Sequence, residues 1–242
     1  MFVGKTSFSG HIPRLPIGLI EFDASHTLID GGLIASNFEG LDYLTWLLLD
    51  GCIFNSPIPT EMALLPNLQY LYTSDSMITG DLSYLKGMPA IFEHFAHNNP
   101  KLGGELYSFI GSLHTLASLN VGNCNITGTI PPSLGNLESM QQMWLNDNHL
   151  TGEIPPELGN LFALEIFEVQ GNDIVGEMPV SICTLEDFAS LSKLGVDCNE
   201  VFVSKKGTTL KKRRWWDCKS LCQFSSRDSL TISILFFGFC HT

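Results

Sequence analysis

Basic residues are scarce over most of this 242-residue sequence. Residues 1–200 carry 5 Lys/Arg against 23 Asp/Glu, whereas residues 201–242 carry 8 against 2. A nucleic-acid-binding surface needs dense lysine and arginine to neutralise phosphates. The net charge of −12 therefore argues against nucleic acid as a partner. The opposite charge balances of the two stretches indicate two physically different segments.

Long apolar runs are also lacking. No stretch reaches the roughly 18 consecutive apolar residues that span a bilayer, and the apolar run at 230–239 is too short. The first ten residues lack the charged start, apolar centre and small-residue cleavage site of a secretory signal. The sequence alone therefore leaves the compartment open. Membrane association would need a segment outside this sequence or, less directly, the C-terminal tail.

Motifs that carry catalysis are absent as well. The sequence has no nucleophile elbow, phosphate-binding loop, H-E-x-x-H or paired C-x-x-C. The seven histidines are scattered, and the only close pair, His94 and His97, has no recognisable third metal ligand. We therefore predict that the protein is not an enzyme and uses neither a metal nor a cofactor.

What the sequence does contain is an internal repeat. Three segments align without gaps: LHTLASLNVGNCNITGTIPPSLGN from Leu113, LESMQQMWLNDNHLTGEIPPELGN from Leu137 and LFALEIFEVQGNDIVGEMPVSICT from Leu161. A fixed period of this length is typical of solenoid proteins. One position, which we call the anchor, follows the strand-like part of each repeat. Counted at a step of 24 residues, the anchors are Cys52, Ser76, Pro100, Cys124, Asn148 and Asn172.

These segments, above all GTIPPSLGNL (128–137) and GEIPPELGNL (152–161), resemble the plant-type class of the leucine-rich repeat family. The resemblance covers about residues 1–198 and weakens at 73–106. It implies an α/β solenoid, a right-handed superhelix with a short-stranded parallel sheet on the concave face and 3-10 or irregular segments on the convex side. The expected divisions are degenerate repeats at 1–40, six regular 24-residue repeats at 41–184, a C-terminal cap at 185–202, and a poorly ordered tail, basic then apolar, at 203–242.

The resemblance also assigns a role to the anchor. It places this side chain inside the turn, where an amide satisfies buried backbone groups of neighbouring coils. Cysteine can substitute there as a small buried group with a weak donor. The expected structural ladder comprises Cys52, Ser76, Cys124, Asn148 and Asn172.

Two modifications are suggested by the sequence. Residues 181–198 combine a helix-like stretch with two cysteines, which fits a closing cap. We predict a Cys183–Cys198 disulfide, with two buried free thiols as the alternative. Asn125-Ile126-Thr127 is an acceptor sequon whose asparagine should face outward, and its glycosylation depends on export.

The variable positions around each strand should form columns on the concave face. Aromatic residues with polar neighbours are typical of protein-binding surfaces. The alternative is that they only cover the backbone between coils. The candidate ligand-binding residues are Trp46, Tyr70, Tyr72, His94, Asn120, Trp144 and Glu168.

A further column lies one residue before the anchor. It contains Gly51, Asp75, Asn99, Asn123, Asp147 and Gly171. Such residues suit strand-ending turns, and this interpretation is favoured over a cation-attracting stripe.

After residue 203 the repeat spacing disappears. KKRR at 211–214 and the following apolar run can be interpreted as a nuclear address, as a stop-transfer end, or as translation of non-coding or shifted sequence.

Together these features predict a non-catalytic scaffold that binds a protein, peptide or glycan on its concave or lateral face. The family resemblance favours a receptor-like or secreted recognition protein at the cell surface or outside the cell. The acidic repeats favour a basic or sugar-rich partner. The alternative hypothesis is a structural or degenerate fragment with no specific ligand.

Overall fold

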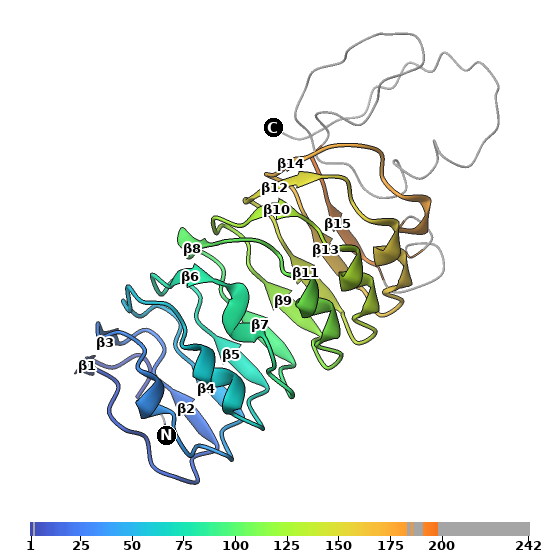
Figure 1. The fold of residues 1–242 in the computed structure, drawn as a ribbon. Coiled ribbons are helices and arrows are strands. Elements are labelled where there is room, and N and C mark those ends of the chain that lie inside the picture. The colour runs from blue at the N-terminus through green and yellow to red at the C-terminus, as the bar shows by residue number, and fades with distance from the viewer. Residues whose placement is uncertain (2, 183–184, 186–190, 198–242) are drawn as a thin grey trace, which may run out of the picture.

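The computed structural model describes residues 1, 3–182, 185 and 191–197. Within these residues the chain winds into a solenoid, and successive coils stack along one axis (Figure 1). Each coil contributes one short strand to a continuous sheet and returns through irregular backbone and a 3-10 turn.

The main sheet has eight strands, and every neighbouring pair is parallel. Its strands are β2 (Glu21–Asp23), β4 (Trp46–Leu48), β5 (Tyr70–Tyr72), β7 (Glu93–Phe95), β9 (Ser118–Asn120), β11 (Gln142–Trp144), β13 (Ile166–Glu168) and β15 (Lys193–Gly195).

A second row of short strands, paired in three separate parallel sheets, runs along another side of the coils (Figure 1). It comprises β1 (Ser9–Gly10), β3 (Leu28–Ile29), β6 (Thr79–Asp81), β8 (Lys101–Gly103), β10 (Thr127–Thr129), β12 (His149–Gly152) and β14 (Asp173–Ile174). The 3-10 segments are η1 (Ala35–Asn37), η2 (Thr60–Leu64), η3 (Leu82–Leu85), η4 (Ser108–Ser112), η5 (Pro132–Asn136) and η6 (Pro156–Asn160). The predicted solenoid, with a parallel sheet opposite 3-10 turns, is confirmed.

The core follows from the alternation of side chains along each three-residue strand. The middle residue of every main-sheet strand is buried, whereas most of its neighbours face outward. The inward residues are Phe22, Leu47, Leu71, His94, Leu119, Met143, Phe167 and Leu194. Each coil buries its apolar residues against the coils on either side, so the core is a single column along the solenoid.

Close packing between coils explains why glycine occupies the position of Gly135 in the L-G-N segment and of Gly111 one repeat earlier. A Cβ on Gly135 would overlap the backbone oxygen of Glu157 in the next coil, and a Cβ on Gly111 would overlap that of Ser133. The 3-10 turns of neighbouring coils therefore pack too closely for any side chain at this position.

One repeat departs from the expected 24-residue step. The strand register pairs Tyr70 with Glu93 and Glu93 with Ser118. The first step is 23 residues long and the second is 25, so the predicted register is wrong by one residue at β7. Because side chains alternate along a strand, this shift exchanges the inward and outward faces there.

Candidate functional site

The anchor side chains form a hydrogen-bonded ladder beneath the strand-ending turns. The Asn148 side-chain amide donates to the carbonyl oxygens of Val121 (2.8 Å) and Leu145 (3.1 Å), and its Oδ1 accepts from the Ile126 amide (2.9 Å). Asn172 makes the equivalent bonds one coil further on, to the Leu145 carbonyl and from the Leu150 amide. Each anchor therefore joins its own coil to the preceding one.

The serine and cysteine anchors contact backbone carbonyl oxygens at the equivalent places, but through a single hydroxyl or thiol instead of an amide. Ser76 Oγ donates to the Leu49 carbonyl oxygen (2.7 Å), and the thiols of Cys52 and Cys124 lie 3.3 and 3.2 Å from the carbonyl oxygens of Ala24 and Ala96. Burial raises the pKa of both thiols, to about 11 for Cys124, which keeps them protonated as donors.

Two ladder residues were missed by the sequence prediction. Asn99, and not Pro100, is the anchor of the irregular repeat, because its Oδ1 accepts from the amides of Ser76 (3.1 Å) and Ile78 (2.8 Å). Thr27 is the anchor of the preceding degenerate repeat, and its hydroxyl donates to the Ala24 carbonyl. A fixed 24-residue count could not find either residue, because both adjoin a 25-residue step.

The column before the anchor consists of left-handed turn residues. The positions are His26, Gly51, Asp75, Asn98, Asn123, Asp147 and Gly171, with φ between 51° and 71°. Glycine, asparagine and aspartate tolerate this conformation best. The turn interpretation is therefore correct, with Asn98 in place of Asn99.

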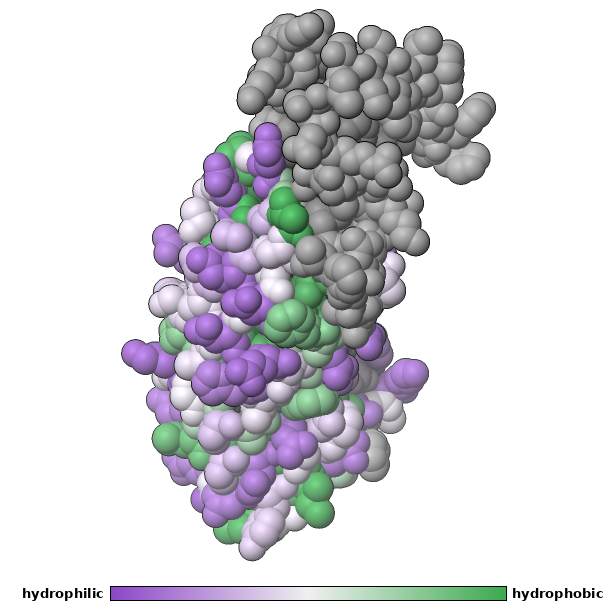
Figure 2. All heavy atoms as spheres, turned by 90° about the vertical axis from the view of Figure 1, so that its right-hand side faces the viewer, coloured by the Kyte–Doolittle hydropathy of each residue, from purple (hydrophilic) through white to green (hydrophobic). Residues whose placement is uncertain are grey.

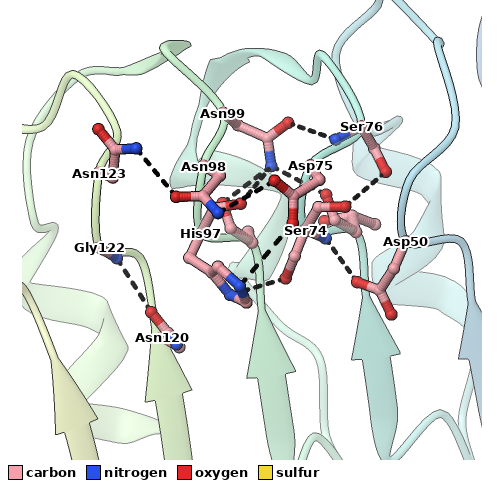
Figure 3. A network of polar contacts seen from close by, with 12 residues as sticks. Asp50, Ser74, Asp75, Ser76, His97, Asn98, Asn99, Asn120, Gly122 and Asn123 are labelled. Carbon is pink, nitrogen blue, oxygen red and sulfur yellow. Dashed lines mark hydrogen bonds and ion pairs between the residues drawn. The ribbon is translucent and has the colours of Figure 1, made fainter.

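A polar network joins the turns that follow β4, β5 and β7 (Figure 3). Asp50 accepts from the Ser74 amide (2.7 Å), and the Ser74 hydroxyl lies 2.9 Å from His97 Nδ1. The Asn98 amide donates to Asp75 (3.0 Å). Burial raises the pKa of Asp50, while the Ser74 hydrogen bonds and nearby histidines oppose that rise. The network holds together the turns at the C-terminal ends of these three strands.

Aromatic rings cover the outward face of β4, β5 and β7. Trp46 and Tyr70 stack with ring centroids 3.5 Å apart and planes 6° apart, and Tyr72 stacks on Phe95 at 4.8 Å. Phe92 meets the edge of the Tyr70 ring at 5.9 Å. These five side chains are only partly buried, and we call them the aromatic surface.

The aromatic surface is tied to its surroundings at two points. The Tyr72 hydroxyl donates to the Glu93 carboxylate, which together with burial raises the pKa of Tyr72 and keeps the phenol neutral. Phe95 meets Trp144 edge-on at 5.9 Å, on either side of the column position held by Asn120. The predicted residues Trp46, Tyr70 and Tyr72 are thus brought together, and Phe92 and Phe95 belong with them.

His94 does not lie on this face, contrary to the prediction. It is fully buried as the inward residue of β7. Its Nε2 lies 2.6 Å from the Tyr84 hydroxyl and its Nδ1 lies 2.9 Å from the Leu71 carbonyl oxygen. Burial lowers the pKa of His94 to about 4, so the ring is a neutral core residue. Phe95 and Glu93 take the outward positions that the 24-residue count gave to Ala96 and His94.

Glu168 is outward in register but is covered. It is 7% exposed and forms an ion pair with Lys193 on the neighbouring strand. Its carboxylate is therefore already engaged within the protein.

The other large exposed apolar side chains are dispersed. Ile17, Leu64 and Phe162 are each more than 70% exposed and lie outside the main sheet. Figure 2 shows one face of the molecule, where hydrophobic residues stand singly or in small groups among hydrophilic ones. That face offers no broad apolar surface to a partner.

Several sequence predictions concern other parts of the chain. Asn125 is exposed. Cys183 and Cys198 lie outside the described residues, as does the tail from 198 onward. Among the described residues, no three His, Cys, Asp or Glu side chains are grouped closely enough to hold a metal ion. The helices in that part of the chain are all too short or too polar to traverse a bilayer.

The comparisons with known proteins agree with this geometry. A family model described as Leucine Rich Repeat matches residues 115–137 and 139–161. No curated protein matches the sequence. These two segments are leucine-rich repeats, and the solid likeness to solved structures is to plant receptor ectodomains.

Solved plant receptors share the fold. The plant peptide hormone receptor RGFR1, in complex with RGF2, is 26% identical with a TM-score of 0.74, over 80% of this chain and 31% of that one. PEPR1 with AtPEP1 is 25% identical with a TM-score of 0.69, over 82% and 28%. The Arabidopsis receptor kinase HAESA ectodomain, with an extended IDA peptide hormone ligand, is 23% identical with a TM-score of 0.64, over 83% and 37%. The chain spans about a third of the length of these receptors.

Proposed function

We propose that this chain is a non-catalytic ligand-binding module that captures a peptide or a protein segment on the concave face of its main sheet. The aromatic surface carries the proposal. Large aromatic side chains supply much of the binding energy in protein interfaces, and here four of them lie on three adjacent strands, with Phe92 directly before β7, and stay partly exposed.

The similar receptors support a peptide as the ligand. RGFR1 is a plant peptide hormone receptor solved in complex with RGF2, and PEPR1 was solved with AtPEP1. Both are at least 25% identical to this chain over four fifths of its length. Extended peptides suit a surface built of parallel three-residue strands, because a peptide that crosses the strands can contact successive coils with successive side chains.

The same proposal covers how the chain is divided and in which compartment it acts. The repeats at 41–184 form the binding module, preceded by degenerate repeats at 1–40 and closed by a cap at 185–202, which the Cys183–Cys198 disulfide joins to the last repeat. The module acts at the cell surface or outside the cell, as receptor ectodomains do, and belongs to a longer receptor-like or secreted protein. Glycosylation of Asn125 is compatible with this location, because Asn125 is exposed two residues before β10.

A displayed library of random peptides of about twelve residues, about 40 Å long when extended, tests the proposal. Peptides selected on the full chain should bind it saturably. Replacing Trp46, Tyr70 and Tyr72 together by alanine should weaken their binding by roughly 100-fold or more and leave thermal melting nearly unchanged. The matched control replaces the exposed Ile17, Leu64 and Phe162 by alanine and should bind as the wild type does. Equal binding by both triple variants would reject the concave aromatic site.

A further inference from the structure

Carboxylates surround the aromatic surface. On β2, Glu21 and Asp23 are the register partners of Trp46 and Leu48. On β7, Glu93 is the register partner of Tyr70. Asp50 and Asp75 lie in the turns that follow β4 and β5, where the polar network holds them in place (Figure 3). Aromatic rings on β4 and β5 therefore have acidic neighbours on both flanking strands and at one edge.

Basic side chains are sparse in the same area, where Lys5 joins the chain just after β2 through a backbone hydrogen bond to Ser25 (2.7 Å). The five Lys/Arg residues of the repeats are Lys5, Arg14, Lys86, Lys101 and Lys193. Of these, only Lys193 lies on a main-sheet strand, and it forms an ion pair with Glu168 at the far end of the sheet. The ammonium group of Met1 donates to the backbone carbonyl oxygen of Glu21 (2.6 Å). Among the described residues, the outward positions from β2 to β13 thus carry no basic side chain to neutralise Glu21, Asp23 or Glu93.

The stacking of Trp46 and Tyr70 bears on where a ligand group can contact the indole ring. Because Trp46 and Tyr70 come from adjacent strands and stack nearly parallel, their planes stand upright on the sheet. Tyr70 on β5 covers one face of the Trp46 indole, and β2, where Glu21 is the register partner of Trp46, lies on the other side of β4. A cation placed there would contact the electron-rich indole face and a carboxylate together. Trp is the strongest aromatic partner for such a contact.

We propose that the peptide bound by this surface is cationic, and that it places a lysine or arginine side chain between the open face of Trp46 and Glu21. This inference rests on the proposed function and specifies the chemistry of its ligand. Apolar parts of the peptide lie over Tyr70, Tyr72 and Phe95, and a second basic group is attracted by Glu93, which the Tyr72 hydroxyl holds toward the surface.

The test uses the same displayed peptide library on the full chain. The selected peptides should contain more lysine and arginine than the starting library, and a synthetic copy with glutamine at each basic position should bind at least roughly fivefold more weakly. Glu21→Gln with Glu93→Gln should weaken the parent peptide by a similar factor and leave the glutamine copy unaffected. The amide introduced by Glu93→Gln keeps an acceptor for the Tyr72 hydroxyl. Glu105→Gln with Glu157→Gln removes equal charge from exposed positions outside the main sheet and should change nothing.

The outcomes separate the two proposals. Selection of basic peptides that lose affinity with the Glu21/Glu93 variant but not with the Glu105/Glu157 variant supports the inference. Peptides that depend on Trp46, Tyr70 and Tyr72 without any enrichment in basic residues would overturn it and leave the proposed function intact. A library that yields no saturable binder, or binders indifferent to the aromatic triple variant, would overturn both.

Discussion

Two regions of the main sheet differ in what they present. The segment β4, β5 and β7 exposes Trp46, Tyr70, Tyr72 and Phe95, with carboxylates around them. The segment β9, β11 and β13 exposes mostly small or polar side chains, with Trp144 as its one aromatic residue among those positions. Both regions belong to the same parallel sheet, and they differ most visibly in the side chains of the outward columns.

The family model matches residues 115–137 and 139–161, which belong to the second region. The first region departs from the family pattern at several points: a serine anchor at Ser76, coils of 23 and 25 residues, and a buried histidine in the core. The repeats that are easiest to recognise from the sequence are therefore those with few aromatic residues at their outward positions. The repeats that deviate hold the candidate binding surface.

The largest expected loss of folding free energy comes from replacing Asn99, and it tests the irregular register at β7. Asn99→Ala should destabilise the protein by about 3 kcal/mol, because it leaves two buried amides and two buried carbonyls without their side-chain partner. Asn148→Ala, the equivalent change in a regular repeat, should cost on the order of 1–3 kcal/mol. Denaturant unfolding measures both. Pro100→Ala should be nearly silent, and a larger loss at Pro100 than at Asn99 would contradict the register.

The second prediction concerns pH and the core of the irregular coil. The folded pKa of His94, about 4, lies below its ordinary value of 6.5. Well above pH 6.5 the ring is neutral in both states and contributes no pH dependence. As the pH falls from 6.5 to 4, only the unfolded chain binds the proton, so stability should fall by roughly 3 kcal/mol.

The control for this prediction replaces both partners of the buried pair. His94→Leu with Tyr84→Phe removes the titrating ring and leaves no orphaned hydroxyl. Urea midpoints measured between pH 4 and 7 should show a shallower slope for the double variant. Identical slopes for the two proteins would show that His94 is not the buried neutral group described here.

The third prediction returns to the regular region. Gly135→Ala should cost about 1–3 kcal/mol, because its methyl group meets the Glu157 backbone and one coil must shift. Asn136→Ala, at the exposed neighbouring position, is the control and should change the melting temperature little. A neutral Gly135→Ala would mean that the 3-10 turns are not packed backbone to backbone.

The smallest effect on stability is expected for glycosylation. When the chain is expressed in a eukaryotic secretory pathway behind an added signal peptide, Asn125 should carry an N-linked glycan, because its side chain is exposed. Removal by an endoglycosidase should lower the mass without changing the melting temperature. Asn125→Gln should abolish the mass shift, and persistence of the shift would place the glycan elsewhere.

Much of the fold could be predicted from the sequence, because the aliphatic spacing and the motif GEIPPELGNL report directly on coil geometry. Trp46, Tyr70 and Tyr72 could be placed on one face for the same reason. His94 could not, since a compensating pair of short and long coils leaves the flanking repeats in step and hides a one-residue shift between them. Phe95 and Asn99 were missed through the same shift, and their recognition would have required treating Asn99 as a better anchor than Pro100.

Site-specific photo-crosslinking tests the central claim most directly. A photoreactive phenylalanine analogue is placed at one of three positions. These are Leu48, which is the register partner of Tyr72 beside the aromatic surface, Ile166 in the second region, and Phe162 outside the main sheet. With a library-selected peptide bound, the account predicts strong crosslinking from position 48, little from 166 and none from 162. Crosslinking from position 162 with none from position 48 would contradict it.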